Sequence, residues 1–553
     1  MWQHGWRERV WSELDRAWDI IIIGGGITGA GILREAIRAG LRALLVEQGD
    51  FASGTSSRSG KMVHGGLRYL KNAQVQLTIE SVRERDRLVR DGRGLVTPNA
   101  FVLANFRGDN PPDWVFGAGL MIYDAIALKW QHQHLDVKRA RELVPELVSP
   151  ELIGAYRYFD AQTDDARLVL RVLREAVRAG GVALNYARVD GLLRETSNVK
   201  RDASNVMRNA SNVIRNVSGD VCGVVLCDVE TGRTQEVKAR VVINATGAWA
   251  DELRAHEFLQ QQHLRKLRGS HLVFPFARLP LTRAITFLHP RDKRPLYALP
   301  WEGVTLVGTT DYDHPTVETN PSITAPEIVY LIEAAQHVFP AQELSTRDIQ
   351  ATFAGLRPVV DTGNPDPSKE SREFVLWEEN GLLTVTGGKL TTFRLMAQDA
   401  LNAVRHRLPD MKRIIVPQRV LDRLPHDEKL FHTFPPAARL RLLGRYGADA
   451  RALVDAAQPG ELQRIGILQA LWAELRWAAR AEGVVHLDDL LMRRVRVGLL
   501  LPRGGMDCGN RNAIAAHIRA IAQGELGWDD ARWEREEKEY VRLWNACYAM
   551  PSE

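Results

Sequence analysis

Residues 18–29 read WDIIIIGGGITG, and this stretch decides the fold. Four consecutive isoleucines predict a strand that is buried on both faces of a parallel sheet. A GxGxxG run follows this strand directly and opens a predicted helix over 30–39, while residues 42–46 (RALLV) predict a second strand. The pattern is therefore one complete βαβ unit of the kind that binds a dinucleotide.

Each glycine of the run has a separate task in such a unit. Gly24 permits the tight turn, Gly26 lets the backbone approach a pyrophosphate, and Gly29 allows close packing of helix on strand. Thr28 lies within the run, at a helix N-terminus that offers free amides to phosphate charge. Glu47 ends the second strand, where it is placed to accept hydrogen bonds from an adenosine ribose and to disfavour a 2′-phosphate.

The flanking segments favour FAD over a nicotinamide cofactor. Simple nicotinamide enzymes continue with regular βαβ repeats, whereas here residues 49–66 predict a long loop rich in Ser and Gly. We interpret two later segments as further contacts to a larger cofactor. They are residues 244–247 (NATG), which follow a strand, and residues 387–392 (GGKLTT), which precede a helix. The predicted cofactor contacts in these segments are Ser56, Ser57, Lys61, His64, Gly65, Gly66, Ala245, Thr246, Gly247, Gly388, Lys389, Leu390 and Thr391.

The chain as a whole predicts an α/β protein with three parts. Short β-rich runs punctuated by Pro and Gly over 271–311 predict an antiparallel sheet, and the pattern after about residue 400 is helical. We expect a discontinuous Rossmann-like FAD-binding domain, an antiparallel substrate-binding domain and an all-helical C-terminal domain. The expected boundaries are 18–75, 160–262 and 345–400 for the FAD-binding domain, 76–159 and 263–344 for the substrate-binding domain, and 405–553 for the helical domain.

Composition excludes several classes of protein. Of the 553 residues, 45% are hydrophobic and 25% charged, which is typical of a soluble globular protein. A net charge of +5 without a basic tail or stripe argues against nucleic-acid binding. Four unevenly spaced cysteines, no signal peptide and no run of roughly 18–20 apolar residues predict a cytoplasmic protein without a disulfide scaffold or a membrane span. No metal site is predicted.

Two features of the sequence stand apart from this plan. Residues 1–17 predict an amphipathic helix, because Trp2, Trp6, Val10 and Leu14 recur at intervals of four. A helix rich in tryptophan and arginine suits either a lipid headgroup region or packing on the protein itself. Residues 197–217 repeat a seven-residue unit (SNVKRDA, SNVMRNA, SNVIRNV) that is too sparse for a coiled coil. We interpret this repeat as an expanded surface hairpin loop without a catalytic role.

The chain resembles the FAD-dependent glycerol-3-phosphate dehydrogenases, within the D-amino-acid-oxidase-like flavoproteins. The resemblance rests on segments in the family's order from about residue 18 to 400, and LDDLLMRRVRVG looks like part of its helical domain. The carrying segments are IIIIGGGITGAGI, TSSRSGKMVHGGLRYL, DDARLVL, INATGAW, RGSHLVFP, PWEG, VGTTD, FAGLRPVV and GGKLTTFRLM.

The resemblance implies a reaction and its partners. It implies oxidation of sn-glycerol 3-phosphate to dihydroxyacetone phosphate, with FAD taking the hydride from C2 at flavin N5 and passing electrons to a membrane quinone. It also implies a peripheral location on the inner face of the cytoplasmic membrane. The oligomeric state stays open, a homodimer included.

The resemblance also assigns residues around the substrate and flavin. Arg68, Tyr69, Arg357, Arg372 and Lys389 are expected to bind substrate, and His271, Arg357 and Lys389 to act in catalysis. Arginine forks suit a phosphate, because paired charge-assisted hydrogen bonds hold it. A secondary alcohol needs a base to take its hydroxyl proton, and histidine is the natural candidate.

Several alternatives stay open at this point. His64 is the second candidate for the base. The enzyme could be an oxidase that delivers electrons to oxygen, or a dehydrogenase for another hydroxy or amino acid. The third alternative is not an enzyme: a flavin-bound protein that has lost catalysis and binds a partner through its helical domain.

Overall fold

The computed structural model describes residues 2–67, 74–195, 219–258, 263–367, 370–412, 419–425, 434–506 and 513–551. The predicted substrate residues Arg68 and Tyr69 lie outside these ranges, and so does the 197–217 repeat.

The first sheet is built around the isoleucine strand. β1 (Trp18–Ile23) is buried along its whole length and pairs in parallel with β2 (Ala43–Val46) on one side and β10 (Thr234–Asn244) on the other. The order is β17-β18-β10-β1-β2-β7, with β8 and β9 attached through β10. The remaining strands are β7 (Val182–Leu184), β8 (Ala187–Arg194), β9 (Val221–Asp228), β17 (Phe374–Glu379) and β18 (Leu382–Gly387). The predicted parallel α/β sheet is confirmed.

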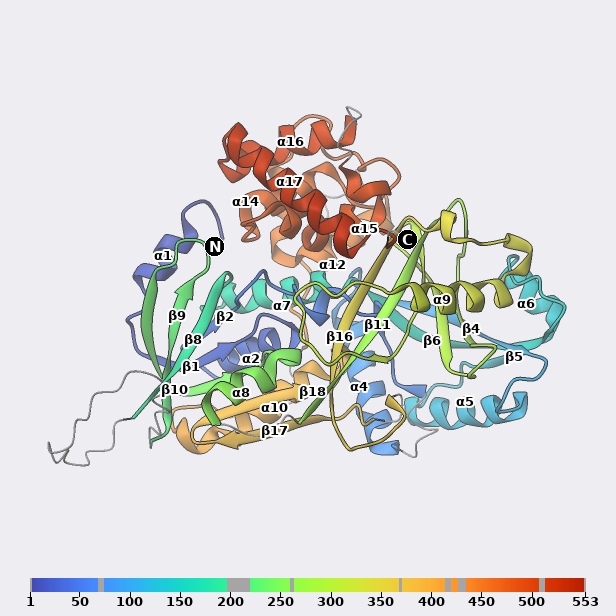
Figure 1. Cartoon of the computed structure of the whole chain (residues 1–553), viewed down its shortest axis with the longest axis horizontal. Coiled ribbons are helices and arrows are strands. Elements are labelled where there is room, and N and C mark those ends of the chain that lie inside the picture. Colours follow the sequence, from blue (N-terminus) through green and yellow to red (C-terminus); the bar gives the residue numbers. More distant parts are fainter. Residues whose placement is uncertain are drawn as a thin grey trace, which may run out of the picture.

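The second sheet is mostly antiparallel and lies beside the first (Figure 1). Its order is β15-β11-β14-β13-β12-β4-β6-β3, with β16 on β11 and β5 on β6. Its strands are β3 (Met62–Val63), β4 (Val96–Phe106), β5 (Gln133–Leu135), β6 (Leu152–Thr163), β11 (Leu264–Pro275), β12 (Ala284–Leu288), β13 (Pro295–Trp301), β14 (Val304–Gly308), β15 (Tyr312–Asp313) and β16 (Ala351–Val360). β16 falls within the 345–400 range expected for the FAD-binding domain, yet it pairs with β11 over ten residues of the second sheet.

Helices cover the sheets and build the C-terminal part, which Figure 1 shows in orange and red at one end of the molecule. The helices before residue 404 are α1 (Trp6–Ser12), α2 (Ile27–Arg38), α4 (Val75–Asp91), α5 (Asp113–Ala127), α6 (Val137–Leu143), α7 (Asp165–Arg178), α8 (Ala250–Phe258), α9 (Ala325–Val338) and α10 (Phe393–Ala403). The later ones are α12 (Pro436–Tyr446), α13 (Ala450–Asp455), α14 (Trp472–Ala481), a π-helical turn at Asp489–Arg494, α15 (Val497–Leu500), α16 (Ala513–Leu526) and α17 (Asp530–Cys547).

Buried ion pairs join the C-terminal helices to the first sheet and its connections. Arg494 forms a two-pronged pair with Asp50, at 2.6 and 2.7 Å. Arg496 reaches both Asp164 and Asp165 at the start of α7. All these side chains are almost completely buried, so each charge depends on its partner.

The tryptophans near the N-terminus pack on the protein itself. Trp2, Trp6, Trp11 and Leu14 are buried in the core of the first sheet. The indole of Trp2 stacks on Phe51 at 4.9 Å between ring centroids. The alternative that these side chains lie in lipid headgroups is therefore wrong, because they face inward. Within the described ranges, no helix combines the length and the apolar character that crossing a membrane requires.

Candidate functional site

A cavity of about 1310 Å³ opens where the two sheets meet. Its lining includes the residues that follow β1, β2, β10 and β18 at the carboxyl ends of these parallel strands. Ligands of open parallel sheets bind at this edge. The second sheet contributes residues of β6, β12, β13 and β16 to the opposite wall. The cavity therefore joins a nucleotide-binding edge to the antiparallel sheet.

The glycine run has the geometry that a pyrophosphate cradle requires. Gly24 has a φ of +115°, and a β-carbon on Gly29 would collide with the Gly24 carbonyl oxygen. A β-carbon on Gly26 would lie 3.1 Å from the Ser56 hydroxyl oxygen, where it would narrow the cavity. The backbone N–H of Ile27 donates to Ser56 Oγ at 3.0 Å, so the loop hydroxyl lies at the N-terminus of α2. The N-terminal end of α2 and its helix dipole favour a bound phosphate at this position.

Glu47 lies at the end of β2 and lines the cavity, as the sequence predicts. Its carboxylate accepts backbone N–H groups from Gly25 at 2.6 Å and from Gly49 at 2.9 Å. Burial raises the pKa of Glu47 even though these hydrogen bonds oppose the shift. Each carboxylate oxygen has a second lone pair, so both can still accept a ribose hydroxyl.

Most of the predicted cofactor residues come together around the cavity. Those that line it are Gly24, Gly26, Thr28, Glu47, Ser56, His64, Gly66, Ala245, Thr246, Gly247, Gly388, Lys389, Leu390 and Thr391. Gly29, Ser57, Lys61 and Gly65 do not line it. Gly29 instead packs α2 against β1, and the N–H of Gly65 donates to the buried Asp160 at 3.0 Å.

The Lys61 side chain, a predicted cofactor contact, lies away from the cavity lining. Its ammonium is fully buried behind the 56–61 loop, where it pairs with Asp165 at 2.8 Å and donates to the Ser57 carbonyl at 2.6 Å. Burial lowers the pKa of Lys61 to about 8, against the opposing effect of Asp165. Lys61 and Ser57 therefore support the loop from behind, since their polar groups are already bonded to each other and to α7.

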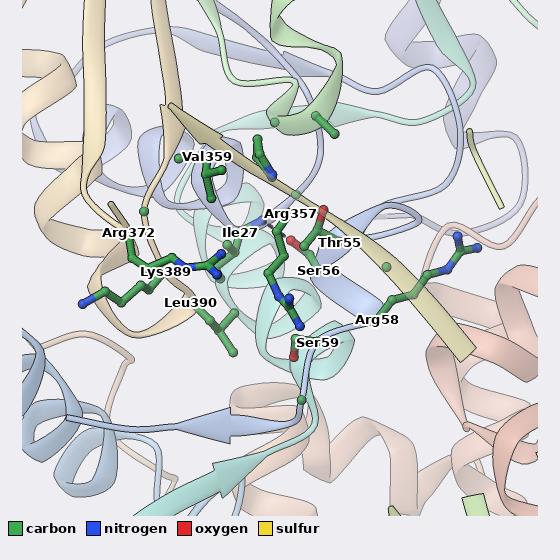
Figure 2. A pocket seen from close by; sticks show the side chains of 18 of the residues that line it. Ile27, Thr55, Ser56, Arg58, Ser59, Arg357, Val359, Arg372, Lys389 and Leu390 are labelled. Atoms are coloured by element: carbon green, nitrogen blue, oxygen red, sulfur yellow. Dashed lines mark hydrogen bonds between the residues drawn. The ribbon is translucent and has the colours of Figure 1, made fainter. Parts of the chain in front are cut away.

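The predicted arginines converge on one carboxylate that the sequence analysis did not single out. Arg357 donates to Asp311 Oδ1 at 2.6 Å, and Arg372 donates to Asp311 Oδ2 at 2.9 Å. Arg294 approaches the same oxygen at 3.0 Å. Figure 2 shows Arg357 and Arg372 side by side, while Arg58 points the opposite way. Three guanidinium groups therefore surround one carboxylate, and two of them, those of Arg357 and Arg372, belong to side chains that line the cavity.

Hairpin register is the signal that could have revealed Arg294 and Asp311. β13 and β14 form a tight antiparallel hairpin in which Tyr297 lies opposite Gly308. Extending this register by three residues places Arg294 opposite Asp311. Both β-rich runs can be recognised in the sequence, but their pairing becomes clear only from the hairpin register.

Lys389 lines the cavity beside the arginines, but its ammonium points away from them in Figure 2. It donates to Ser81 Oγ of α4 at 2.9 Å.

The two candidate histidines differ in position. His64 lines the cavity, and among the described residues no other histidine does. His271 is completely buried and does not line the cavity, because Tyr297 lies between the His271 ring and the cavity. Burial, with help from the nearby Arg357 and Lys61, lowers the pKa of His271 well below its usual value. A base must reach the proton it removes, so this geometry favours His64.

Comparison with known proteins agrees with the cavity. Residues 19–394 match the family model of FAD-dependent oxidoreductases, and residues 411–533 match the C-terminal domain of alpha-glycerophosphate oxidase. The glycine cradle, the Glu47 carboxylate and the volume of the cavity fit an FAD molecule. The fold and site are those of an FAD-dependent oxidoreductase, with FAD as its cofactor.

Individual relatives show which family of FAD-dependent oxidoreductases the chain is similar to. The chain is 32% identical to the aerobic glycerol-3-phosphate dehydrogenase of Staphylococcus saprophyticus over 88% of each chain. It is 36% identical to the enzyme of the same name from Bacillus subtilis, over 73% of this chain and 70% of that one. The FAD complex of a glycerol-3-phosphate dehydrogenase from Bacillus halodurans superposes with a TM-score of 0.76 at 27% identity, covering 99% of this chain and 98% of the other. The chain belongs to the aerobic glycerol-3-phosphate dehydrogenase family.

Proposed function

We propose that this protein oxidises sn-glycerol 3-phosphate to dihydroxyacetone phosphate and passes the electrons to a membrane quinone. The cluster of Arg294, Arg357 and Arg372 around Asp311 is the observation that supports this substrate. Arg357 and Arg372 of this cluster line the cavity, where their guanidinium groups complement a phosphomonoester, which carries nearly two negative charges at neutral pH. An amino acid or an unphosphorylated hydroxy acid offers one carboxylate charge, so it matches these guanidinium groups less well than a phosphate does.

Chain residues orient the substrate between the cluster and the flavin. Arg357 is fixed by Asp311 and by Thr309 Oγ1 at 2.8 Å, so its guanidinium is held before the substrate arrives. Preorganised donors of this kind bind phosphate strongly because little side-chain entropy is lost. Bound FAD supplies the hydride acceptor at N5. His64, from the cavity wall, is the proposed acceptor of the C2 hydroxyl proton.

Substrate choice tests this proposal. Initial rates with an artificial electron acceptor are measured for sn-glycerol 3-phosphate, glycerol, lactate and D-alanine. We expect a preference of at least about 100-fold in kcat/KM for the phosphorylated triol, from the charge-assisted hydrogen bonds alone. Equal rates with glycerol would refute a phosphate-binding role for the arginine cluster.

The proposed membrane contact is α5, not the N-terminal helix. Trp114, Met121 and Ile122 on α5 are more than half exposed, and so are Leu128 and Trp130 just after it. Isolated exposed apolar residues are common, but a contiguous apolar helix marks an interaction surface. Figure 1 shows α5 along the edge opposite the C-terminal helices.

The same helix reaches the cavity. Val115, Phe116 and Ile122 of α5 line it together with the flavin-site residues. A lipid-soluble acceptor could therefore pass from a membrane at α5 to the cavity without crossing water. The exposed apolar helix beside the cavity supports a quinone acceptor and a peripheral membrane location, which we propose to be the inner face of the cytoplasmic membrane.

Vesicle flotation tests the membrane contact. The holoenzyme is mixed with vesicles of phosphatidylcholine and phosphatidylglycerol, and bound flavin is measured in the floated fraction. A variant with Trp114→Glu, Met121→Glu and Trp130→Glu is expected to stay at the bottom, because each charge must be taken out of water. Val329→Glu, which changes an apolar residue of α9 that is 62% exposed, is the matched control and floats like the unaltered protein. Equal flotation of both variants would refute the role of α5.

Acceptor use is tested separately. With sn-glycerol 3-phosphate as donor, turnover with a short-chain ubiquinone or menaquinone analogue is compared with hydrogen peroxide formation in air. A quinone rate well above the peroxide rate is expected. Stoichiometric peroxide with no quinone reduction would make the protein an oxidase.

A further inference from the structure

Four neighbouring strands place a row of residues on one face of the second sheet. In the register of β13, β14, β11 and β16, Tyr297 lies opposite Gly308, Gly308 opposite His271, and His271 opposite Phe353. The His271 imidazole stacks on the Phe353 ring, with centroids 4.5 Å apart and planes 9° apart. Its Nε2 lies 2.6 Å from the Tyr297 hydroxyl oxygen. Of this row, Tyr297 lines the cavity.

Two glycines make room for this contact. A β-carbon on Gly308, midway between the two side chains, would collide with the His271 ring. A β-carbon on Gly60, in the loop facing the sheet, would collide with the Tyr297 hydroxyl. Both φ values lie outside the left-handed region, so backbone conformation does not require glycine here. The space for the pair is therefore what these glycines provide.

The surroundings of His271 fix which way the hydrogen bond runs. The ring is completely buried, and its Nδ1 has no hydrogen-bond partner among the described residues. Burial, Arg357 and Lys61 all oppose an imidazolium, so the ring is neutral with one proton. Buried N–H groups without an acceptor are rarer than unpaired acceptors. The proton therefore lies on Nε2, which donates to the Tyr297 oxygen.

The orientation of the Tyr297 hydroxyl follows from this tautomer. Burial raises the pKa of Tyr297 above its usual value, so the phenol keeps its proton at neutral pH. One lone pair of the Tyr297 hydroxyl oxygen already accepts the Nε2–H of His271, so the hydroxyl proton cannot point toward that ring. It is free to point into the cavity that Tyr297 lines.

We propose that Tyr297 is a catalytic residue whose O–H donates to the substrate oxygen being oxidised, and that His271 is the positioning residue that fixes its direction. This proposal rests on the proposed function. The guanidinium groups supply the charge that a phosphate needs, whereas Tyr297 is a neutral donor. A neutral donor is suited to the C2 oxygen, which gains negative charge as its proton leaves. A donor held in place before this charge develops lowers the barrier to the reaction.

Single-turnover kinetics test the role of Tyr297. The holoenzyme is mixed anaerobically with sn-glycerol 3-phosphate, and loss of the oxidised flavin band gives a limiting rate and an apparent Kd. Tyr297→Phe is expected to lower the limiting rate by about 10- to 100-fold with less than a threefold change in Kd, because loss of one preorganised donor slows such reactions. A limiting rate reduced by less than threefold, or an effect confined to Kd, would overturn the proposal.

Variants of His271 test the positioning role. His271→Leu removes the donor to Tyr297, whereas His271→Gln can place an amide N–H near the position of Nε2. The Leu variant should match Tyr297→Phe, the Gln variant should recover part of the rate, and Tyr297→Phe with His271→Leu should lose no more than either alone. Stoichiometric bound flavin in each variant shows that the fold is retained. Additive losses in the double variant, or equal rates in the Leu and Gln variants, would overturn the positioning role of His271.

A readout independent of turnover is the tautomer itself. In protein labelled with ¹⁵N-histidine, the His271 signals are those absent from His271→Gln. We expect the neutral Nε2–H form from pH 6 to 9. An Nδ1–H form or an imidazolium would contradict the proposed direction of the hydrogen bond. If sn-glycerol 3-phosphate fails to reduce the unaltered flavin, the proposed function is refuted instead, and the nitrogen spectrum still decides the orientation of the pair.

Discussion

Replacing Arg357 with alanine removes one of the three guanidinium groups around Asp311. The positive charge around Asp311 falls by one, while Arg294 and Arg372 still contact this carboxylate. Hydrogen bonds to charged groups are each worth about 1.5 to 3 kcal/mol. Two such bonds are lost, but the remaining arginines can recover part of the attraction. We therefore expect a loss of about 2 to 3 kcal/mol in transition-state binding, or about 30- to 150-fold in kcat/KM.

The assay measures kcat/KM for sn-glycerol 3-phosphate and for glycerol in the same preparations. Because glycerol lacks the phosphate, Arg357→Ala should change its slow rate by less than threefold. Arg291→Ala removes a nearby exposed arginine paired with Glu333 and serves as the control. Bound flavin should remain stoichiometric in both variants. An unchanged kcat/KM for the phosphorylated substrate, or equal losses with both substrates, would refute the reasoning.

Three further predictions concern the cofactor and the fold. Gly29→Ala should abolish stoichiometric FAD binding, because its β-carbon would collide with the Gly24 carbonyl oxygen, whereas Gly524→Ala, with open space around it, should leave FAD content unchanged. Asp165→Asn should lower the free energy of unfolding by about 3 to 5 kcal/mol, since Lys61 would stay buried without its carboxylate partner and Arg496 would keep only Asp164, against about 0 to 1 kcal/mol for Asp455→Asn in an exposed pair; equal denaturation midpoints would contradict this. Burial opposes the charged form of His486, but hydrogen bonds with Glu230 and Glu536 raise its pKa to about 11. This raised pKa stabilises the fold fully below about pH 6.5, so the advantage over His486→Gln should shrink as the pH rises from 6.5 to 11, and a constant gap in denaturation curves would contradict it.

The cofactor half of the site could be predicted because its signals are local. Gly24, Gly26 and Gly29 lie within six residues of one another, and Glu47 ends the next strand of the same βαβ unit. Such a unit fixes its own geometry, so position along the chain is enough to place each residue.

The substrate half depends on contacts between distant segments. Asp311 collects guanidinium groups from residues 17, 46 and 61 positions away, and only strand pairing brings them together. The same is true of Tyr297 and His271, which meet across Gly308. The family resemblance assigned His271 to catalysis, but Tyr297 lies between His271 and the cavity.

Burial was the other feature that the sequence could not determine. Trp2, Trp6 and Trp11 have the spacing of a lipid-facing helix, but the same spacing suits a helix packed on its own core. Lys61 lies in a loop that lines the cavity, yet its side chain turns inward because Asp165 provides a buried partner. Amphipathic spacing and loop membership do not show which partner a side chain finds.

Anaerobic titration of the purified flavoprotein with sn-glycerol 3-phosphate tests the central claim most directly. The account predicts that each equivalent of substrate bleaches the visible band of one bound FAD and releases one equivalent of dihydroxyacetone phosphate. Protein that carries no FAD, or a flavin band that stays unchanged in excess substrate, would contradict it.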